Sequence, residues 1–110
     1  MKMTFKEARA ALIEALKEGR YQHEARDAQA EKNLLAVGDI SPDEVIEILK
    51  ACRGKLHRKE PHYAKAEIEV HVFKARKKIS RWQQWFVRAY FIDEDAWFIS
   101  VHPAEWEIGK

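Results

Sequence analysis

The spacing of the apolar residues changes near residue 55, and this change constrains the fold more than any other feature of the sequence. Before it, apolar residues recur at helical intervals of three and four; after it, they alternate with polar residues, as in strands. A chain of 110 residues is the usual size of one domain. We therefore expect a single α+β domain, with helices over about 4–53, a sheet over about 55–102 and a short C-terminal tail at 103–110.

The first two helices are predicted from capping signals and composition. Thr4 and Glu7 have the form of a capping box, apolar residues follow at helical spacing, and Gly19 is a typical stop signal, which predicts a helix over 5–18. Residues 24–37 are rich in good helix formers and contain neither glycine nor proline. They predict a second helix, although its apolar stripe is weak until its last residues.

The third helix carries the strongest local signal. In Ser41-Pro42-Asp43-Glu44 a serine cap, a proline at the first helical position and a glutamate three residues later coincide. Gly54 then ends the helix. The single cysteine, Cys52, falls on the predicted buried stripe, so we interpret it as a small core residue.

The second half predicts a twisted antiparallel sheet of three to four strands, three of them near 68–73, 82–92 and 96–102, with an edge strand near 55–58 and a charged turn at 77–81. In the last hairpin, a loop with an odd number of residues, such as 93–95, places the alternating apolar residues of both strands on the same face. The opposite face then carries the following side chains: Phe86, Arg88, Tyr90, Phe98, Ser100 and His102.

Positive charge is strongly segregated along the chain, although the net charge is only +2. Residues 50–59 and 74–88 together hold eleven lysines and arginines and no acid. Such segregation gives a strong local positive field, which favours RNA as a partner. The alternative is that the basic runs only solvate a loop and a hairpin. The second run supplies the candidate RNA-binding residues, together with Tyr90: Lys74, Arg76, Lys77, Lys78 and Arg81.

Several classes of protein are disfavoured. No apolar run has the form of a signal peptide or approaches the ~20 residues that span a bilayer, and one cysteine excludes an internal disulfide, so we expect a cytoplasmic protein without a membrane partner. The five histidines lack short metal-ligand spacing, and glycine-rich phosphate loops and serine-elbow motifs are absent. We predict no metal and no cofactor.

Metal-free phosphodiester chemistry remains open. It needs a base for the ribose 2′-OH, cations at the phosphate and an acid for the leaving oxygen. Histidine and arginine suit these roles. His71, Arg88, Tyr90 and His102 are expected to meet on one sheet face beside the basic turn. Alternatively, Phe86 and its apolar neighbours on this face pack beneath a helix and the polar groups fringe that contact.

Three short stretches carry a family resemblance. They are His23-Glu24-Ala25-Arg26, Ile40-Ser41-Pro42-Asp43-Glu44-Val45 and Ile99-Ser100-Val101-His102, within roughly residues 20–102. In these stretches and in the order of its helices and strands, the chain resembles the small bacterial toxins of the RelE, BrnT and MqsR group, and more closely a family of small domains related to them. The resemblance implies a metal-independent endoribonuclease that cleaves mRNA, either free or bound to the ribosome. It also implies that a cognate antitoxin holds the enzyme inactive. It implies four catalytic candidates: His23, Arg26, Arg88 and His102.

Two other interpretations stay open. A non-catalytic domain would use the same basic surface to bind RNA or an acidic protein. A structural or inhibitor protein would use Trp82 and Trp106 as interface anchors. For His23, a capping or packing role at the start of the second predicted helix is the alternative to catalysis.

Overall fold

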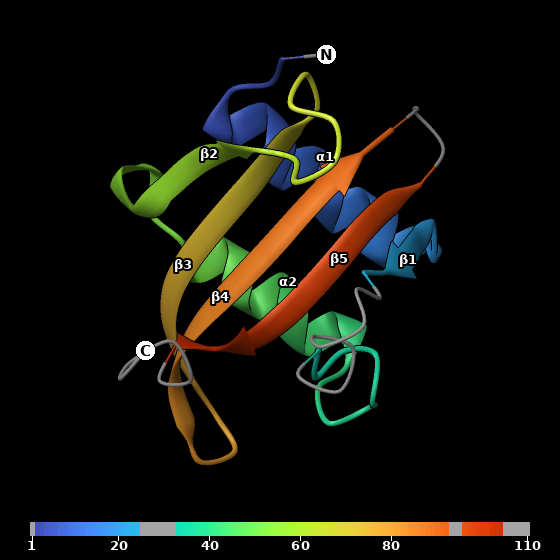
Figure 1. The fold of residues 1–110 in the computed structure, drawn as a ribbon. Coiled ribbons are helices and arrows are strands. Elements are labelled where there is room, and N and C mark those ends of the chain that lie inside the picture. The colour runs from blue at the N-terminus through green and yellow to red at the C-terminus, as the bar shows by residue number, and fades with distance from the viewer. Residues whose placement is uncertain (1, 25–32, 93–95, 105–110) are drawn as a thin grey trace.

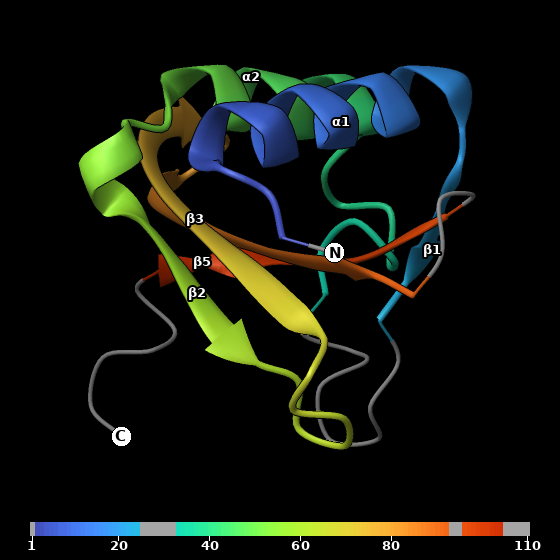
Figure 2. The ribbon, with the colours of Figure 1, turned by 90° about the horizontal axis from the view of Figure 1, so that it is seen from above.

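The structure is a computed structural model that describes residues 2–24, 33–92 and 96–104. Two helices lie side by side across one face of a five-stranded sheet, so that the fold has two layers (Figures 1 and 2). The elements are α1 Phe5–Glu18, β1 Tyr21–His23, α2 Pro42–Ala51, the 3-10 turn η2 Gly54–Leu56, β2 His57–Pro61, β3 Glu69–Ile79, β4 Trp82–Phe91 and β5 Trp97–Pro103. The α+β class is therefore confirmed.

Both helix entries are the predicted capping boxes. The side chains of Thr4 and Ser41 each accept a hydrogen bond from the backbone amide three residues later, and the carboxylates of Glu7 and Glu44 each accept one from the amide of the cap residue. These local bonds satisfy amides that a helix start leaves unpaired. Gly19 ends α1 with a φ of 73°, a conformation that costs glycine little.

The prediction of a helix over 24–37 is wrong wherever the structure describes that segment. Glu24 and Asn33 are irregular and residues 34–37 form turns, whereas 25–32 lie outside the described residues. The segment contributes buried Asn33, Leu34 and Leu35, but its apolar residues lack the continuous stripe that would hold a helix on the sheet. Two N-terminal helices are therefore present in the described residues instead of three.

The sheet has the order β1-β5-β4-β3-β2, and its first pair is parallel. It is therefore mixed and has five strands, not the three or four antiparallel strands that the sequence predicts. The parallel strand β1 escapes prediction because three residues are too few to show a period. The segment that follows η2 pairs as β2 over His57–Pro61, slightly later than the predicted edge strand.

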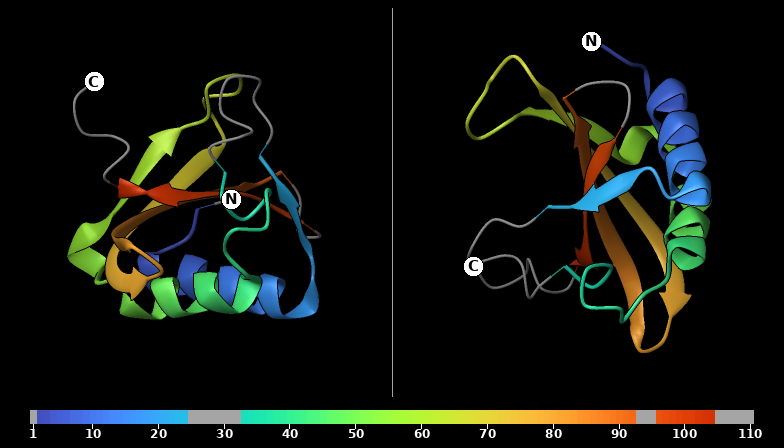
Figure 3. Two further views of the ribbon diagram at one scale, coloured as in Figure 1. Left: turned by 90° about the horizontal axis from the view of Figure 1, so that it is seen from below. Right: turned by 90° about the vertical axis from the view of Figure 1, so that its right-hand side faces the viewer.

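The register of the last hairpin is confirmed. Val87 pairs with Val101, Ala89 with Ile99 and Phe91 with Trp97, which places all of their side chains on the face that the helices cover. Cys52 belongs to the same core, as predicted. The described residues place no helix on the other face (Figure 3). Among the described residues, neither helix is long and apolar enough to cross a membrane.

Candidate nucleic-acid interface

The second basic stretch runs from β3 through the turn into β4, and the tip of this hairpin projects past the end of the sheet (Figure 1). The predicted turn at Lys77–Arg81 is too long, because β3 continues to Ile79 and the turn consists of Ser80 and Arg81. Ser80 has a φ of 58°, the left-handed conformation that two-residue hairpin turns favour. The hairpin thus presents its basic side chains from the paired strand β3 and from a two-residue turn.

A bulge interrupts the hairpin between Arg76 and Ile79. The buried side chain of Trp85 anchors it, because the indole Nε1 donates a hydrogen bond of 2.9 Å to the Lys77 carbonyl oxygen. Bulges bend a strand and change the direction of its side chains. Lys77 and Lys78 are both exposed here, although strict alternation would turn one of them toward the helices.

Five basic side chains of the hairpin have no acidic partner in the part of the chain that the structure describes: Lys74, Arg76, Lys77, Lys78 and Arg81. Two of them lie over aromatic rings. Lys74 Nζ is 5.7 Å from the centroid of Phe86, and Arg81 Cζ is 4.7 Å from that of Trp82. Such contacts position a cation without neutralising it. Beside these residues lies a hollow of about 230 Å³ that Lys74 and Arg76 help to line.

Arg88 and His102 lie on adjacent strands and point to the face without helices. Phe86 pairs with His102 and Arg88 pairs with Ser100, so Arg88 and His102 are diagonal neighbours. Cβ atoms in this relationship are typically about 7–8 Å apart, within reach of long side chains. The structure thus brings together two of the four catalytic candidates.

Arg88 is engaged in an ion pair. Its Nη1 lies 2.7 Å from Glu60 Oε1, and Arg58 Nε lies 3.0 Å from Glu60 Oε2. Burial raises the pKa of Glu60, but the hydrogen bonds and charges of the two arginines outweigh this effect and leave the pKa below its usual value. To bind Arg88, a phosphate would have to displace Glu60 or share the Arg88 guanidinium with it.

Tyr90 and His102 are more enclosed than the sequence suggests, each being only 8% exposed. Tyr90 stacks on Phe98 at 5.3 Å between centroids and meets the edge of His62 at 4.5 Å. The ring centroids of His102 and Phe86 are 5.7 Å apart. Because the Tyr90 ring is already covered by these neighbours, it offers little surface to a stacking base.

His23 and His71 do not join Arg88 and His102. His23 pairs with Ile99, and His71 pairs with Ala89, so both belong to the side of the sheet that carries the helices. The expectation that His71 meets Arg88 is wrong. Residues two apart in a strand point to the same side, so His71 faces the core together with Phe73. His23 is exposed at the edge of β1, and Arg26 lies outside the described residues.

The structure reveals a histidine pair that the sequence analysis did not single out. His57 Nε2 lies 3.0 Å from His71 Nδ1, and the rings stack beside Phe73. His71 is fully buried and its Nε2 has no hydrogen-bond partner among the described residues. Burial, reinforced by His57, lowers the pKa of His71 to about 4. The sequence signal that could have revealed this pair is a histidine, His71, at a strand position that faces the core.

His62 organises the loop between β2 and β3. Its Nδ1 accepts hydrogen bonds from the amides of Ala64 and Lys65, at 3.1 and 3.2 Å. The loop lies on the face away from the helices (Figure 3). Two backbone donors on Nδ1 require the proton of the neutral imidazole to be on Nε2. His62 is therefore a structural residue of this loop.

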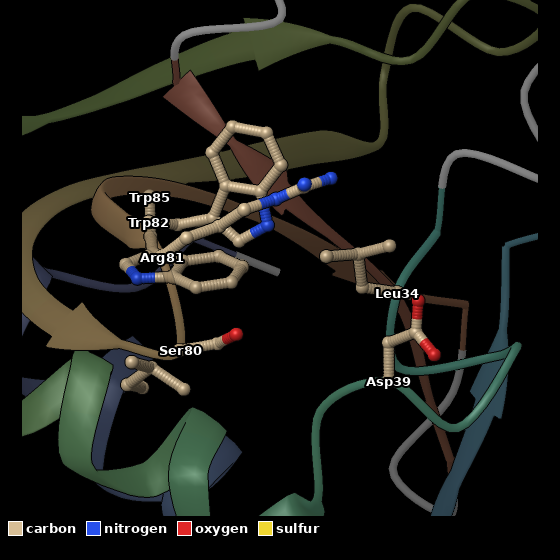
Figure 4. A pocket seen from close by; sticks show the side chains of 7 residues that line it. Leu34, Asp39, Ser80, Arg81, Trp82 and Trp85 are labelled. Carbon is tan, nitrogen blue, oxygen red and sulfur yellow. The ribbon is translucent and has the colours of Figure 1, made fainter.

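A pocket of about 380 Å³ lies between the tip of the β3–β4 hairpin and the segment that leads into α2. Trp82, Trp85 and Arg81 stand on one side, and Leu34 and Asp39 face them from the other (Figure 4). Its lining is mixed, because three of the seven lining residues contribute a guanidinium, a carboxylate and the Ser80 hydroxyl. Polar groups that converge on a pocket can fix the orientation of a small ligand.

Comparisons with protein-family models, with curated proteins and with solved structures found no match to this chain. The relationship to small RNA-cleaving toxins therefore stays a prediction from the sequence. Within the described residues, no three His, Cys, Asp or Glu side chains are placed to hold one metal ion.

Proposed function

We propose that this protein binds RNA through the β3–β4 hairpin and the adjoining sheet face. The observation that carries the proposal is the group of five hairpin cations without acidic partners among the described residues. Four of the five are exposed, and Lys74 is half-buried. Phosphate contacts by lysine and arginine supply most of the affinity of non-specific nucleic-acid binding.

RNA is favoured over a protein partner because the cations alternate with aromatic surface. The Arg81 guanidinium lies over the partly exposed ring of Trp82. Single-stranded nucleic acid is recognised by such combinations, with phosphates on cations and bases on aromatic rings. An acidic protein partner needs the cations but gains little from the indoles.

The test compares two triple variants with the same charge change. Arg76→Gln/Lys77→Gln/Lys78→Gln neutralises the hairpin, and Lys6→Gln/Lys17→Gln/Lys50→Gln neutralises exposed lysines on the helices. Binding of a single-stranded RNA is measured by fluorescence anisotropy over a range of salt. Each lost phosphate contact changes the slope of log K against log [salt] by about 0.7. We expect the hairpin variant alone to lose a slope of about 2, and equal slopes for the two variants would refute the proposal.

Endoribonuclease activity is a second candidate function. It is favoured because Arg88 and His102 are diagonal neighbours on one face of the sheet. In this reaction a base takes the proton of the 2′-OH, the 2′-oxygen attacks phosphorus, and the 5′-oxygen leaves as it is protonated, giving a 2′,3′-cyclic phosphate. His102 would take the proton of the 2′-OH and give a proton to the leaving 5′-oxygen. Arg88 would bind the phosphate after its ion pair with Glu60 opens. A cognate antitoxin that covers this face belongs to the same candidate.

Cleavage is tested with purified protein and RNA, with and without ribosomes. His102→Ala is expected to abolish turnover while binding persists, and Arg88→Ala to weaken both. His23→Ala is the matched control, since His23 points to the other side of the sheet. Intact RNA in every reaction, together with unimpaired growth on expression, would eliminate the enzyme and leave RNA binding.

A further inference from the structure

We propose that the pocket between Trp82, Trp85 and Asp39 takes one unpaired guanine base. This inference rests on the proposed RNA binding for its biological meaning, because the base would arrive on a strand bound to the hairpin. Arg81 belongs to both sites, since it is one of the five hairpin cations and also lines the pocket.

The size and walls of the pocket suit a planar ring. Its volume of about 380 Å³ is within the range of small-molecule sites and exceeds the need of a single base. The partly exposed indole of Trp82 lies on one side, with the buried Trp85 next to it, and Leu34 lies on the opposite side (Figure 4). Trp85 is held by its bond to Lys77, so this wall is fixed before a ligand enters. A base placed between the walls gains stacking on one side and apolar contact on the other.

The polar groups of the pocket select among bases. The Asp39 carboxylate has no hydrogen-bond or ionic partner among the described residues, and as a carboxylate it only accepts. Guanine offers two adjacent donors on its Watson–Crick edge, N1–H and the N2 amino group, at the spacing of two carboxylate oxygens. Adenine offers one amino donor beside an acceptor, and uracil one imide donor between two acceptors. A bidentate match is therefore possible with guanine alone.

The charge balance of the pocket supports the same choice. Arg81 and Asp39 stand on opposite sides, so a neutral base between them meets donors from one and acceptors from the other (Figure 4). Guanine O6 and N7 are acceptors, and arginine is the side chain that pairs with them most often. Cytosine, with one amino donor, leaves one carboxylate oxygen unpaired.

The first experiment uses nucleosides, which lack phosphate and so do not need the phosphate contacts of the other four hairpin cations. Guanosine, adenosine and uridine are titrated into the 110-residue protein, and the indole N–H signals of Trp82 and Trp85 are followed by NMR. We expect guanosine to bind at least tenfold more tightly than the others and to move both signals. Equal responses to guanosine and adenosine, or none to guanosine, overturn the inference.

Variants locate the selectivity. Asp39→Ala is expected to abolish the preference for guanosine, and Asp43→Ala, which removes another exposed aspartate in the first turn of α2, is expected to keep it. Both positions are exposed, and an unchanged amide spectrum outside the pocket establishes that the variants fold. A preference that survives in Asp39→Ala overturns the assignment of the carboxylate.

A second experiment separates this inference from the RNA proposal. Oligouridine with and without one central guanine is compared at several salt concentrations. Guanine selectivity that depends on Asp39, on top of the salt slope from the hairpin, supports both claims. A salt slope without base selectivity sinks the guanine pocket and leaves RNA binding intact. Guanosine binding without RNA binding keeps the pocket and refutes the proposed function.

Discussion

The side-chain amide of Asn33 takes the place of a strand residue beside Val101. Its Oδ1 accepts a hydrogen bond of 3.1 Å from the Val101 amide, and its Nδ2 donates one of 2.8 Å to the Ile99 carbonyl. The Val101 carbonyl in turn accepts from the Leu34 amide at 2.8 Å. Because β1 ends at His23, these bonds continue the pairing of β5 where its edge would otherwise be bare.

Replacing Asn33 should destabilise the fold. In Asn33→Ala the buried Val101 amide loses its acceptor, which costs about 1–3 kcal/mol. Asn33→Asp should be worse at neutral pH, because it turns a carboxylate toward the Ile99 carbonyl, and the difference should shrink in acid as the carboxylate is protonated. Urea unfolding at two pH values measures both effects. Gln22→Ala, on the exposed side of β1, is the control, and a loss as small as that of the control would show that the Asn33 bonds contribute little.

The His57–His71 pair makes stability depend on pH. Burial holds the pKa of His71 at about 4 against an ordinary value of 6.5, and burial also lowers the pKa of His57. The unfolded chain therefore binds more protons below pH 6.5, so the stabilisation is complete above this pH and is lost as the pH falls toward 4. The loss from His71 amounts to roughly 3 kcal/mol.

Denaturant unfolding at half-unit intervals from pH 7 to pH 4.5 measures this dependence. Above pH 5 the paired carboxylate of Glu60, whose pKa is lowered, stays ionised and contributes little to the slope. In His71→Phe the slope should flatten, because the buried group no longer titrates. Identical slopes for the wild-type protein and His71→Phe would contradict the assignment.

The loop between β2 and β3 should depend on an acceptor at residue 62. In His62→Asn the amide oxygen lies near the position of Nδ1 and can accept from the Ala64 and Lys65 amides, whereas His62→Leu removes both bonds. We expect a cost of about 1–3 kcal/mol for leucine and a smaller one for asparagine. Hydrogen exchange at these two amides reports the loop directly, and equal protection in both variants would exclude the acceptor role.

Glu60 should compete with RNA for the sheet face. Its single carboxylate pairs with both Arg58 and Arg88, so Glu60→Gln removes one negative charge that competes with phosphate for these two guanidinium groups. We expect RNA affinity to rise several-fold and the salt dependence to steepen, at a stability cost of about 1 kcal/mol or less for these partly exposed pairs. Anisotropy titrations provide the measurement. Unchanged affinity would restrict the RNA contact to the hairpin and exclude Arg88 from it.

Features that depend on neighbours in the chain were predictable. The capping boxes at Thr4 and Ser41 form within four residues, so their sequences specify them completely. The faces of β4 and β5 followed from a two-residue period and one short connection. The basic character of the hairpin is likewise a property of consecutive residues.

The errors concern partners far away in the sequence. Asn33 has its role because β5 lies beside it 66 and 68 residues later, and composition suggested a helix instead. His71 faces the core because β3 pairs with β4 in one register, although its residue type suggested an active site. The ion pair of Arg88 joins β4 to an edge strand 28 residues earlier. Local propensities set the ends of helices and the alternation of strands, but the free energy of burying a face chooses the register and so assigns each polar side chain to the core or to solvent.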